Sequence, residues 1–287
     1  MDALSFYFFY LVNGIISFLP LRILYIFSDI LFVFTFYFPG YRKNIVYNNL
    51  HNSFPEKSEE EIQTIARKFY RHLADLFAEV VKLNHIDKKE HIKRCKLENL
   101  EVIEKLWSEG RDAIVVLGHY NNWEYLIHFP LFCKQTCISI YKPLNNKYFD
   151  RYLTKLRSKY GMVLTPMSLV AREIVRRRNN GEHILVSFLA DQTPARGDIH
   201  YRTKFLNQDT PVFLGAEKIA TKYDMAVIFL NHQKVKRGYY KTTVELLLEH
   251  TSGLEEHIIT EAHIKRLEEI IREKPEYWLW SHRRWKY

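Results

Sequence analysis

A histidine and a glutamate separated by four residues are the strongest candidates for catalysis in this sequence. His119 and Glu124 lie in the segment LGHYNNWE, directly after the apolar run Ala113–Leu117. Such a run predicts a buried strand, and ligands of open α/β sheets bind beyond the carboxyl ends of the strands. Gly118 allows a sharp turn there. The start of a helix disfavours a protonated histidine, so His119 suits the role of a general base.

The spacing of this pair restricts how the two side chains can meet. On an ideal helix, residues five apart point about 140° away from each other. We therefore expect His119 to lie in a loop before the helix, where Glu124 can accept a hydrogen bond from one ring nitrogen. Such a carboxylate would fix the tautomer of the ring and stabilise the imidazolium formed on proton transfer.

The sequence offers no separate nucleophile for a covalent intermediate. It contains no G-x-S-x-G motif, and no serine or cysteine has the local context of a nucleophile. The simplest chemistry is direct attack of a hydroxyl, deprotonated by His119, on an activated acyl carbonyl such as a thioester. The protein would also have to supply an oxyanion donor, from backbone amides or from a cationic side chain.

Short apolar runs alternate with amphipathic segments along most of the chain, which indicates an α/β domain. Ser58 and Glu61 form a capping-box pattern that predicts the start of a helix. No repeat or linker is visible after residue 50, so we expect one catalytic domain over residues 41–287. The predicted strands are 113–117, 137–141, 184–190, 226–230 and 242–248, and the predicted helices are 59–83, 121–133, 148–160, 168–181, 211–223 and 255–272.

The first forty residues differ from the rest of the sequence. Leu4–Leu19 carries no charge, Pro20 interrupts the pattern, and Leu21–Phe38 is again mostly apolar and rich in aromatic residues. Both runs are shorter than the roughly 20 residues of a spanning helix. Residues 1–40 are predicted to form a membrane anchor, either one marginal span or a shallow hairpin. The basic pair Arg42–Lys43 would stay on the cytoplasmic side. The alternative is two buried helices of a soluble domain.

The charge balance indicates an anionic partner. Lys and Arg exceed Asp and Glu by nine, and the pI is about 9.2. Such a chain could bind nucleic acid, an anionic membrane surface or an acidic protein. The run Arg176–Arg178 has two readings, a solvated helix end or a docking site for an acidic carrier or lipid phosphate. The three cysteines show no disulfide framework and favour a reducing compartment.

Two other functions fit the same residues. His119, Glu124 and His128 could bind a metal ion, which would make the chain a metal-dependent membrane hydrolase. A non-enzymatic basic module is the third reading, because His282–Lys286 combines basic and aromatic residues that could contact nucleic acid or anionic headgroups. Metal content would test the second function, and substitution of His119 would test the third.

Several segments together resemble the bacterial lipid A biosynthesis (late) acyltransferase family, whose signature is H-x4-D/E. The resemblance covers nearly the whole chain in order. Departures from the family pattern are Gly118, where many members have Asn, and Phe205–Asn207, which replaces an aromatic-Gly pattern. The matching segments are His119–Glu124, Asn44–Pro55 (NIVYNNLHNSFP), Tyr141–Asn145 with Arg157-x3-Gly161, Ala190–Gly197 (ADQTPARG) and Pro275–Lys286 (PEYWLWSHRRWK).

The resemblance implies a glycerolipid-acyltransferase-like α/β fold, a mixed sheet flanked by helices, with a hydrophobic N-terminal helical anchor. It implies an enzyme on the cytoplasmic face of the inner membrane that transfers an acyl chain from acyl carrier protein, or acyl-CoA, to a hydroxyl of a lipid A precursor. Another acceptor, such as an amino-acid lipid or a glycolipid, stays open. No cofactor, metal or nucleic acid is expected. The implied site residues are His119 and Glu124 for catalysis, with Arg157, Asp191, Gln192, Arg196, Arg283 and Arg284 binding substrate or ordering the pocket.

Overall fold

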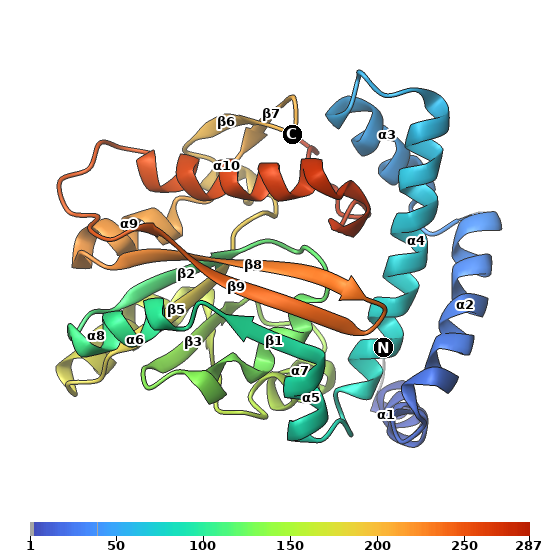
Figure 1. Cartoon of the computed structure of the whole chain (residues 1–287), viewed down its shortest axis with the longest axis horizontal. Helices are drawn as coiled ribbons and strands as arrows, with labels where there is room; N and C mark the ends of the chain where they lie inside the picture. Colours follow the sequence, from blue (N-terminus) through green and yellow to red (C-terminus); the bar gives the residue numbers. More distant parts are fainter. Residues whose placement is uncertain (1–2, 39) are drawn as a thin grey trace.

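A seven-stranded mixed sheet forms the centre of the protein, in a computed structural model that describes residues 3–38 and 40–287. The strand order is β1-β9-β8-β2-β5-β3-β4, and every neighbouring pair is parallel except β8 and β9, which form a long antiparallel hairpin (Figure 1). The predicted α/β fold with a mixed sheet is thereby confirmed. The strands are β1 Cys95–Glu98, β2 Ala113–Leu117, β3 Thr136–Tyr141, β4 Val163–Pro166, β5 Ile184–Leu189, β8 Ala226–Lys236 and β9 Tyr239–Leu248.

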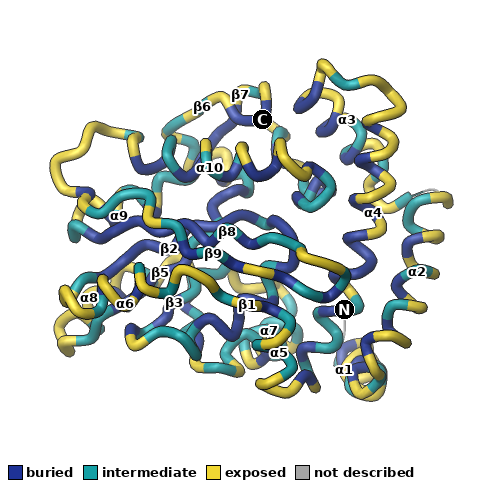
Figure 2. The backbone as a smooth tube through the Cα atoms, in the orientation of Figure 1, coloured by how far each residue is buried: buried dark blue, intermediate teal, exposed yellow. Residues whose placement is uncertain are grey.

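The sheet separates two hydrophobic cores, and the central strand β2 contributes to both. All five residues of β2 are buried. Ile114 and Val116 belong to the core under α4 (Glu59–Lys82), α9 (Gly215–Tyr223) and α10 (Ile258–Glu273). Val115 and Leu117 belong to the core under α6 (Glu101–Ser108) and α7 (Lys147–Arg157). Figure 2 shows the buried strands between the more exposed helices. A parallel strand covered on both faces reads as a continuous apolar run, which explains why this strand was predictable.

The helices surround the sheet, and α4 joins the N-terminal pair to it (Figure 1). The predicted capping box is confirmed, because Ser58 accepts from the amide of Glu61 and the Glu61 side chain accepts from the amide of Ser58. The α-helices are α1 Ala3–Ser17, α2 Leu21–Tyr37, α3 Lys43–Ser53, α4 Glu59–Lys82, α5 Lys88–Arg94, α6 Glu101–Ser108, α7 Lys147–Arg157, α8 Val170–Asn179, α9 Gly215–Tyr223 and α10 Ile258–Glu273.

The predicted N-terminal helical anchor, residues 1–40, is wrong. The described part of this segment forms α1 and α2, and among the described helices none has the length and apolarity needed to cross a bilayer. One side of each helix packs on the protein: Leu24 and Phe32 of α2 are buried, and Phe6 of α1 stacks on Tyr148 of α7. The division of the chain at residue 40 stays a prediction.

Two other segments differ from the predictions, and a third favours one of its two readings. Pro211 does not begin a helix; it ends the strand β7 (Gln208–Pro211), which pairs with β6 (Arg202–Phe205) in a separate hairpin. The segment predicted as a helix over 121–133 is a 3₁₀ helix, η1, over Trp123–Phe132. The arginine run at the end of α8 is paired with carboxylates: Arg176 and Arg177 contact Glu173, and Arg178 contacts Asp112. These pairs support the reading of the run as a helix end.

A buried carboxylate joins α2, α4, the β8–β9 hairpin and the segment before η1. Glu79 of α4 is completely buried, and it accepts hydrogen bonds from Tyr25 of α2 (2.9 Å), Tyr240 of β9 (2.7 Å) and Asn122 (2.6 Å). Burial raises the pKa of Glu79, although the charge of Lys234 and the hydrogen bonds oppose the rise. The side chain therefore satisfies three donors at the meeting point of four segments.

Replacing Glu79 by alanine is expected to lower the free energy of unfolding by about 3 kcal/mol or more, because buried donors would lose their acceptor. Urea unfolding followed by circular dichroism measures this change. The exposed Glu104 on α6 is the control, and Glu104→Ala should change stability by less than about 0.5 kcal/mol. Equal effects of the two substitutions would show that the Glu79 cluster contributes no particular stability.

Candidate active site

The loop between β2 and η1 carries His119 and is held by the C-terminal segment. The amide of Asn121 donates to the carbonyl of Tyr277 (2.9 Å), and the amide of Leu279 donates to the carbonyl of His119 (3.2 Å). Tyr120 and Trp278 form an antiparallel bridge between these bonds. His119 therefore precedes η1 in a loop, as predicted, and the C-terminal segment holds the backbone of that loop at three consecutive residues.

Asp191 is the hydrogen-bond partner of the His119 ring. One carboxylate oxygen, Oδ1, lies 2.6 Å from His119 Nδ1, and the other, Oδ2, accepts from the His119 amide (2.8 Å) and from Trp278 Nε1 (2.8 Å). Burial by itself would raise the pKa of Asp191, but the interactions with His119 and Trp278 outweigh it and lower the pKa to about 2. The carboxylate is therefore ionised at neutral pH, so it accepts a hydrogen bond from the Nδ1–H of His119 and leaves Nε2 as the ring nitrogen with a lone pair.

Gly118 is required by close packing. A Cβ atom at this position would lie 2.6 Å from Leu267 Cδ1 of α10 and 3.3 Å from Asp191 Oδ2. The left-handed backbone of the loop is found instead at Asn121, whose φ is 56°. The turn that the sequence assigned to Gly118 thus depends on Asn121, while Gly118 lets α10 and Asp191 approach the end of β2.

The predicted hydrogen bond between Glu124 and His119 is not formed. Glu124, in the first turn of η1, holds the guanidinium of Arg157 at the end of α7 through two hydrogen bonds, one of them 3.0 Å from Arg157 Nε to Glu124 Oε2. Both ring nitrogens of His119 have other neighbours, Asp191 at Nδ1 and Gln192 at Nε2. The physical reason is the sheet order: Asp191 follows β5, which pairs directly with β2.

A cavity of about 1140 Å³ adjoins these residues. Four of the predicted site residues line it: His119, Glu124, Arg157 and Gln192. Its volume exceeds the roughly 300–1,000 Å³ of common small-molecule sites. Apolar and charged residues both contribute to the wall. The apolar side chains include Leu126, Ile127, Phe129, Met162, Leu164 and Leu230, and the polar ones include Lys142, Thr193, Asp198, His282 and Lys286.

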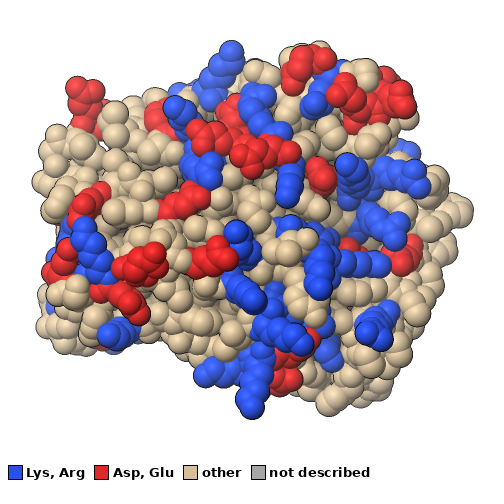
Figure 3. Space-filling view, in the orientation of Figure 1, with Lys and Arg blue, Asp and Glu red and all other residues tan. Residues whose placement is uncertain are grey.

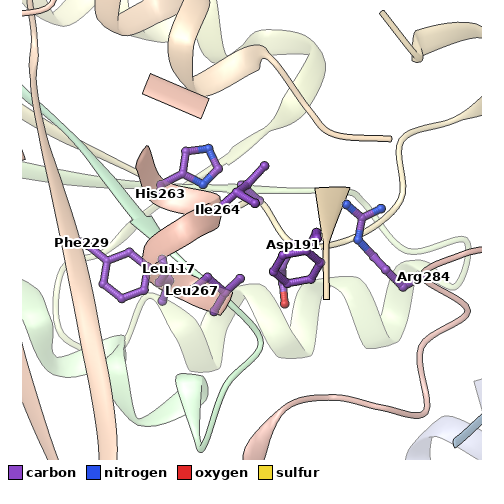
Figure 4. Close-up of a pocket in the computed structure, with 9 residues that line it drawn as sticks. Leu117, Asp191, Phe229, His263, Ile264, Leu267 and Arg284 are labelled. Atoms are coloured by element: carbon purple, nitrogen blue, oxygen red, sulfur yellow. The ribbon is translucent and has the colours of Figure 1, made fainter. Parts of the chain in front are cut away.

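Arg284 lies behind Asp191, in the wall of a second and much smaller cavity of about 10 Å³ (Figure 4). Its side chain is 2% exposed, and its Nε and Nη1 atoms have no hydrogen-bond partner within residues 3–38 and 40–287. Burial lowers the pKa of Arg284 to about 10, while Asp191 opposes the fall. A volume of this size corresponds to about one water molecule. Arg284 is therefore placed to act on the electrostatics of Asp191 and does not line the large cavity.

The other two predicted arginines are exposed and do not line either cavity. Arg196 lies in a single 3₁₀ turn after β5, and Arg283 contributes its backbone carbonyl to Thr193. His282 and Lys286, which the sequence singled out only as part of a basic and aromatic segment, line the large cavity. Both belong to the segment that supplied Arg283 and Arg284, so the segment was found but the side chains facing the cavity were not. Burial lowers the pKa of His282 to about 4, so its ring is neutral at pH 7.

The structure does not support a metal site. Both ring nitrogens of His128 contact backbone carbonyls, those of Tyr125 (2.6 Å) and Cys95 (2.8 Å), and the residue is fully buried. Within residues 3–38 and 40–287, no group of three or more His, Cys, Asp or Glu side chains is arranged to hold an ion. The grouping of His119, Glu124 and His128 is therefore wrong.

Segments far apart in the sequence meet at this site. Asn49 of α3 donates to the carbonyls of Trp280 and His282, and Thr193 donates to the carbonyl of Arg284.

The sequence matches the bacterial lipid A biosynthesis acyltransferase family over residues 2–287, and the chain belongs to this family of acyltransferases. No curated protein matches the chain. Membership in the family assigns an acyltransferase that acts on a lipid A-like lipid.

Replacing Asp191 by asparagine is expected to lower the rate of acyl transfer by about a thousandfold, because the amide can stabilise the wrong tautomer of His119 and cannot balance the imidazolium. The rate is measured as transfer of a labelled acyl chain to lipid. Asp209→Asn is the control, since Asp209 is an exposed residue of β7 that pairs with Arg202. A rate near that of the wild type for Asp191→Asn would exclude this carboxylate as the partner of the base.

Proposed function

We propose that this acyltransferase moves a fatty acyl group from a thioester of acyl carrier protein to a hydroxyl of a lipid A precursor, with His119 as general base. The observation that carries the proposal is the orientation of His119. Asp191 accepts a hydrogen bond from the Nδ1–H of His119, so the Nε2 lone pair is directed away from the carboxylate at a residue that lines the large cavity. A hydroxyl bound in that cavity could lose its proton to Nε2 as it attacks the acyl carbonyl.

The wall of the cavity supports a substrate with a long apolar part and an anionic part. Leu126, Ile127 and Phe129 are nearly completely buried and line it together with Met162 and Leu230. Burying an acyl chain against such residues is worth about 0.8 kcal/mol per CH₂. Lys142 and Lys286 are exposed residues of the same cavity, and they suit the phosphates of a lipid headgroup or of a pantetheine arm.

Arg157 and Glu124 have a different proposed part from the one their spacing suggested. The two hydrogen bonds fix the guanidinium in the cavity wall, where its charge could position an anionic or carbonyl group of a substrate. Glu124 then acts through Arg157, since it does not hold the His119 ring. The proposed reaction uses the acyl thioester as co-substrate and requires no metal or prosthetic group.

The protein is proposed to work at the cytoplasmic face of the inner membrane, resting on the bilayer surface. Large apolar side chains cover the outer side of α1 and α2, among them Phe8 (70% exposed) and Phe34 (58%). In Figure 3 the edge of the molecule over these helices carries few charges, whereas Lys and Arg gather beside it. Apolar side chains flanked by cations suit a bilayer surface with anionic headgroups. Free Cys95, Cys133 and Cys137 agree with a reducing compartment.

The donor and the acceptor are tested together. Purified protein receives acyl chains labelled on acyl carrier protein or on CoA, with a lipid A precursor as acceptor. The wild type should form a new ester lipid, faster from the carrier protein, and His119→Ala should lower the rate by about a hundredfold or more. Absence of a labelled ester with both donors, or an unchanged rate for His119→Ala, would contradict the proposal.

The membrane surface is tested separately with vesicles of phosphatidylethanolamine and phosphatidylglycerol. Phe8→Asp with Phe34→Asp should weaken vesicle binding by more than about a hundredfold in a flotation assay, because each substitution removes roughly 2 kcal/mol of apolar burial. The control is Ile258→Asp, at the start of α10 on the far side of the molecule (Figure 1). If the double variant and the control bind alike, the bilayer contacts another surface.

A further inference from the structure

Gln192 is placed at the reacting nitrogen of the proposed base. It follows Asp191 directly after β5, and its side-chain nitrogen Nε2 lies 3.1 Å from His119 Nε2. Because the Nδ1 proton belongs to the bond with Asp191, His119 Nε2 is the acceptor here and the amide of Gln192 is the donor. Two consecutive residues thus contact opposite ends of one imidazole ring.

This hydrogen bond must break during the reaction. A substrate hydroxyl needs the Nε2 lone pair of His119 in order to transfer its proton, so it replaces the Gln192 amide as hydrogen-bond donor. Gln192 lines the same cavity as His119, and its amide therefore remains close to the incoming hydroxyl. The hydroxyl oxygen forms its new bond to the carbonyl carbon of the thioester. The carbonyl oxygen on that carbon is therefore within reach of the displaced Gln192 amide.

Two neighbouring donors at His119 are already engaged. The amide of His119 and the indole N–H of Trp278 both donate to Asp191. The Gln192 amide is different, because its present acceptor is the lone pair that the substrate takes. It is also neutral, so it adds no charge that would disfavour the imidazolium.

We propose that Gln192 is a catalytic residue whose side-chain amide donates a hydrogen bond to the carbonyl oxygen of the acyl thioester as that oxygen becomes negative. The proposal rests on the function of His119 proposed above and assigns the oxyanion donor of that reaction. Donors that are aimed at developing charge lower the barrier, because they bind the transition state more strongly than the ground state.

The transfer proceeds through a tetrahedral intermediate. The hydroxyl oxygen forms a bond to the thioester carbon, its proton passes to His119 Nε2, and the π electron pair moves to the carbonyl oxygen, where Gln192 stabilises it. The pair then returns, the carbon–sulfur bond breaks, and its electrons leave on sulfur. His119 Nε2 gives its proton to that sulfur, so the products are an ester and a free thiol.

The test compares Gln192→Met with the wild type on two acyl pantetheine donors, an ordinary thioester and a dithioester in which sulfur replaces the carbonyl oxygen. Sulfur is a weak hydrogen-bond acceptor. With the thioester, kcat should fall by about a hundredfold or more and KM should change little. With the dithioester, the same substitution should lower kcat by less than about fivefold, because little of the stabilisation is there to lose.

Controls separate a chemical role from a structural one. Gln63→Met, at an exposed position of α4, should leave both rates unchanged, and thermal unfolding shows whether Gln192→Met is folded. Gln192→Ala is the second variant and should show the same dependence on the donor. An equal loss with both donors, a change in KM alone, or no loss would overturn the proposal.

The outcomes also distinguish this proposal from the one it rests on. If His119→Ala is inactive while Gln192→Met and Gln192→Ala work at the rate of the wild type, the base assignment stands and Gln192 is not the oxyanion donor. If His119→Ala is as active as the wild type, the proposed base is wrong, and the oxyanion assignment falls with it.

Discussion

The site depends on one buried carboxylate that serves three donors. Asp191 joins the end of β5 to the loop after β2 and to Trp278 of the C-terminal segment. Without these donors its burial would favour the neutral acid, and the bond to His119 would lose its charge. Because each donor comes from a fixed backbone position, the carboxylate can hold the ring in one orientation only while all three segments are in place. Gly118 belongs to the same constraint, since a larger residue would displace the Leu267 side chain of α10 and crowd Asp191.

Periodicity and strand-end position predicted much of the fold. The strands β2, β5 and β8 were predictable because their apolar runs are buried on both faces of a mixed sheet. The β6–β7 hairpin was not, because its residues are polar and Pro211 also suits the start of a helix. The N-terminal helices were taken for a membrane anchor because a helix covered on one side by protein and bare on the other has the same composition as a short apolar span.

The sequence predicted several residues of the candidate site but not which of them form hydrogen bonds with each other. His119 and Asp191 each follow a buried strand, and that signal was present in the sequence. Their pairing needs the knowledge that β2 and β5 are neighbours, which a sequence separation of 72 conceals. The partner assigned to His119 was Glu124, because closeness in sequence is visible and sheet order is not. In the structure Glu124 accepts hydrogen bonds from Arg157 at the end of α7, a contact that depends on how α7 packs beside η1.

The carboxylate of Glu79 has a consequence for any attempt to simplify this protein. The Glu79 side chain accepts hydrogen bonds both from Tyr25 of α2 and from Asn122, the residue just before η1. Deleting α1 and α2 to make the protein easier to purify would expose the Glu79 carboxyl group. Solvent would then enter within a few residues of His119 and Glu124. A more tractable form would instead keep α1 and α2 and replace only their outward side chains, such as Phe8 and Phe34, by polar ones. The apolar composition of these helices therefore covers two different faces: the outward face tolerates polar substitutions, and the inward face, which packs on the protein, does not.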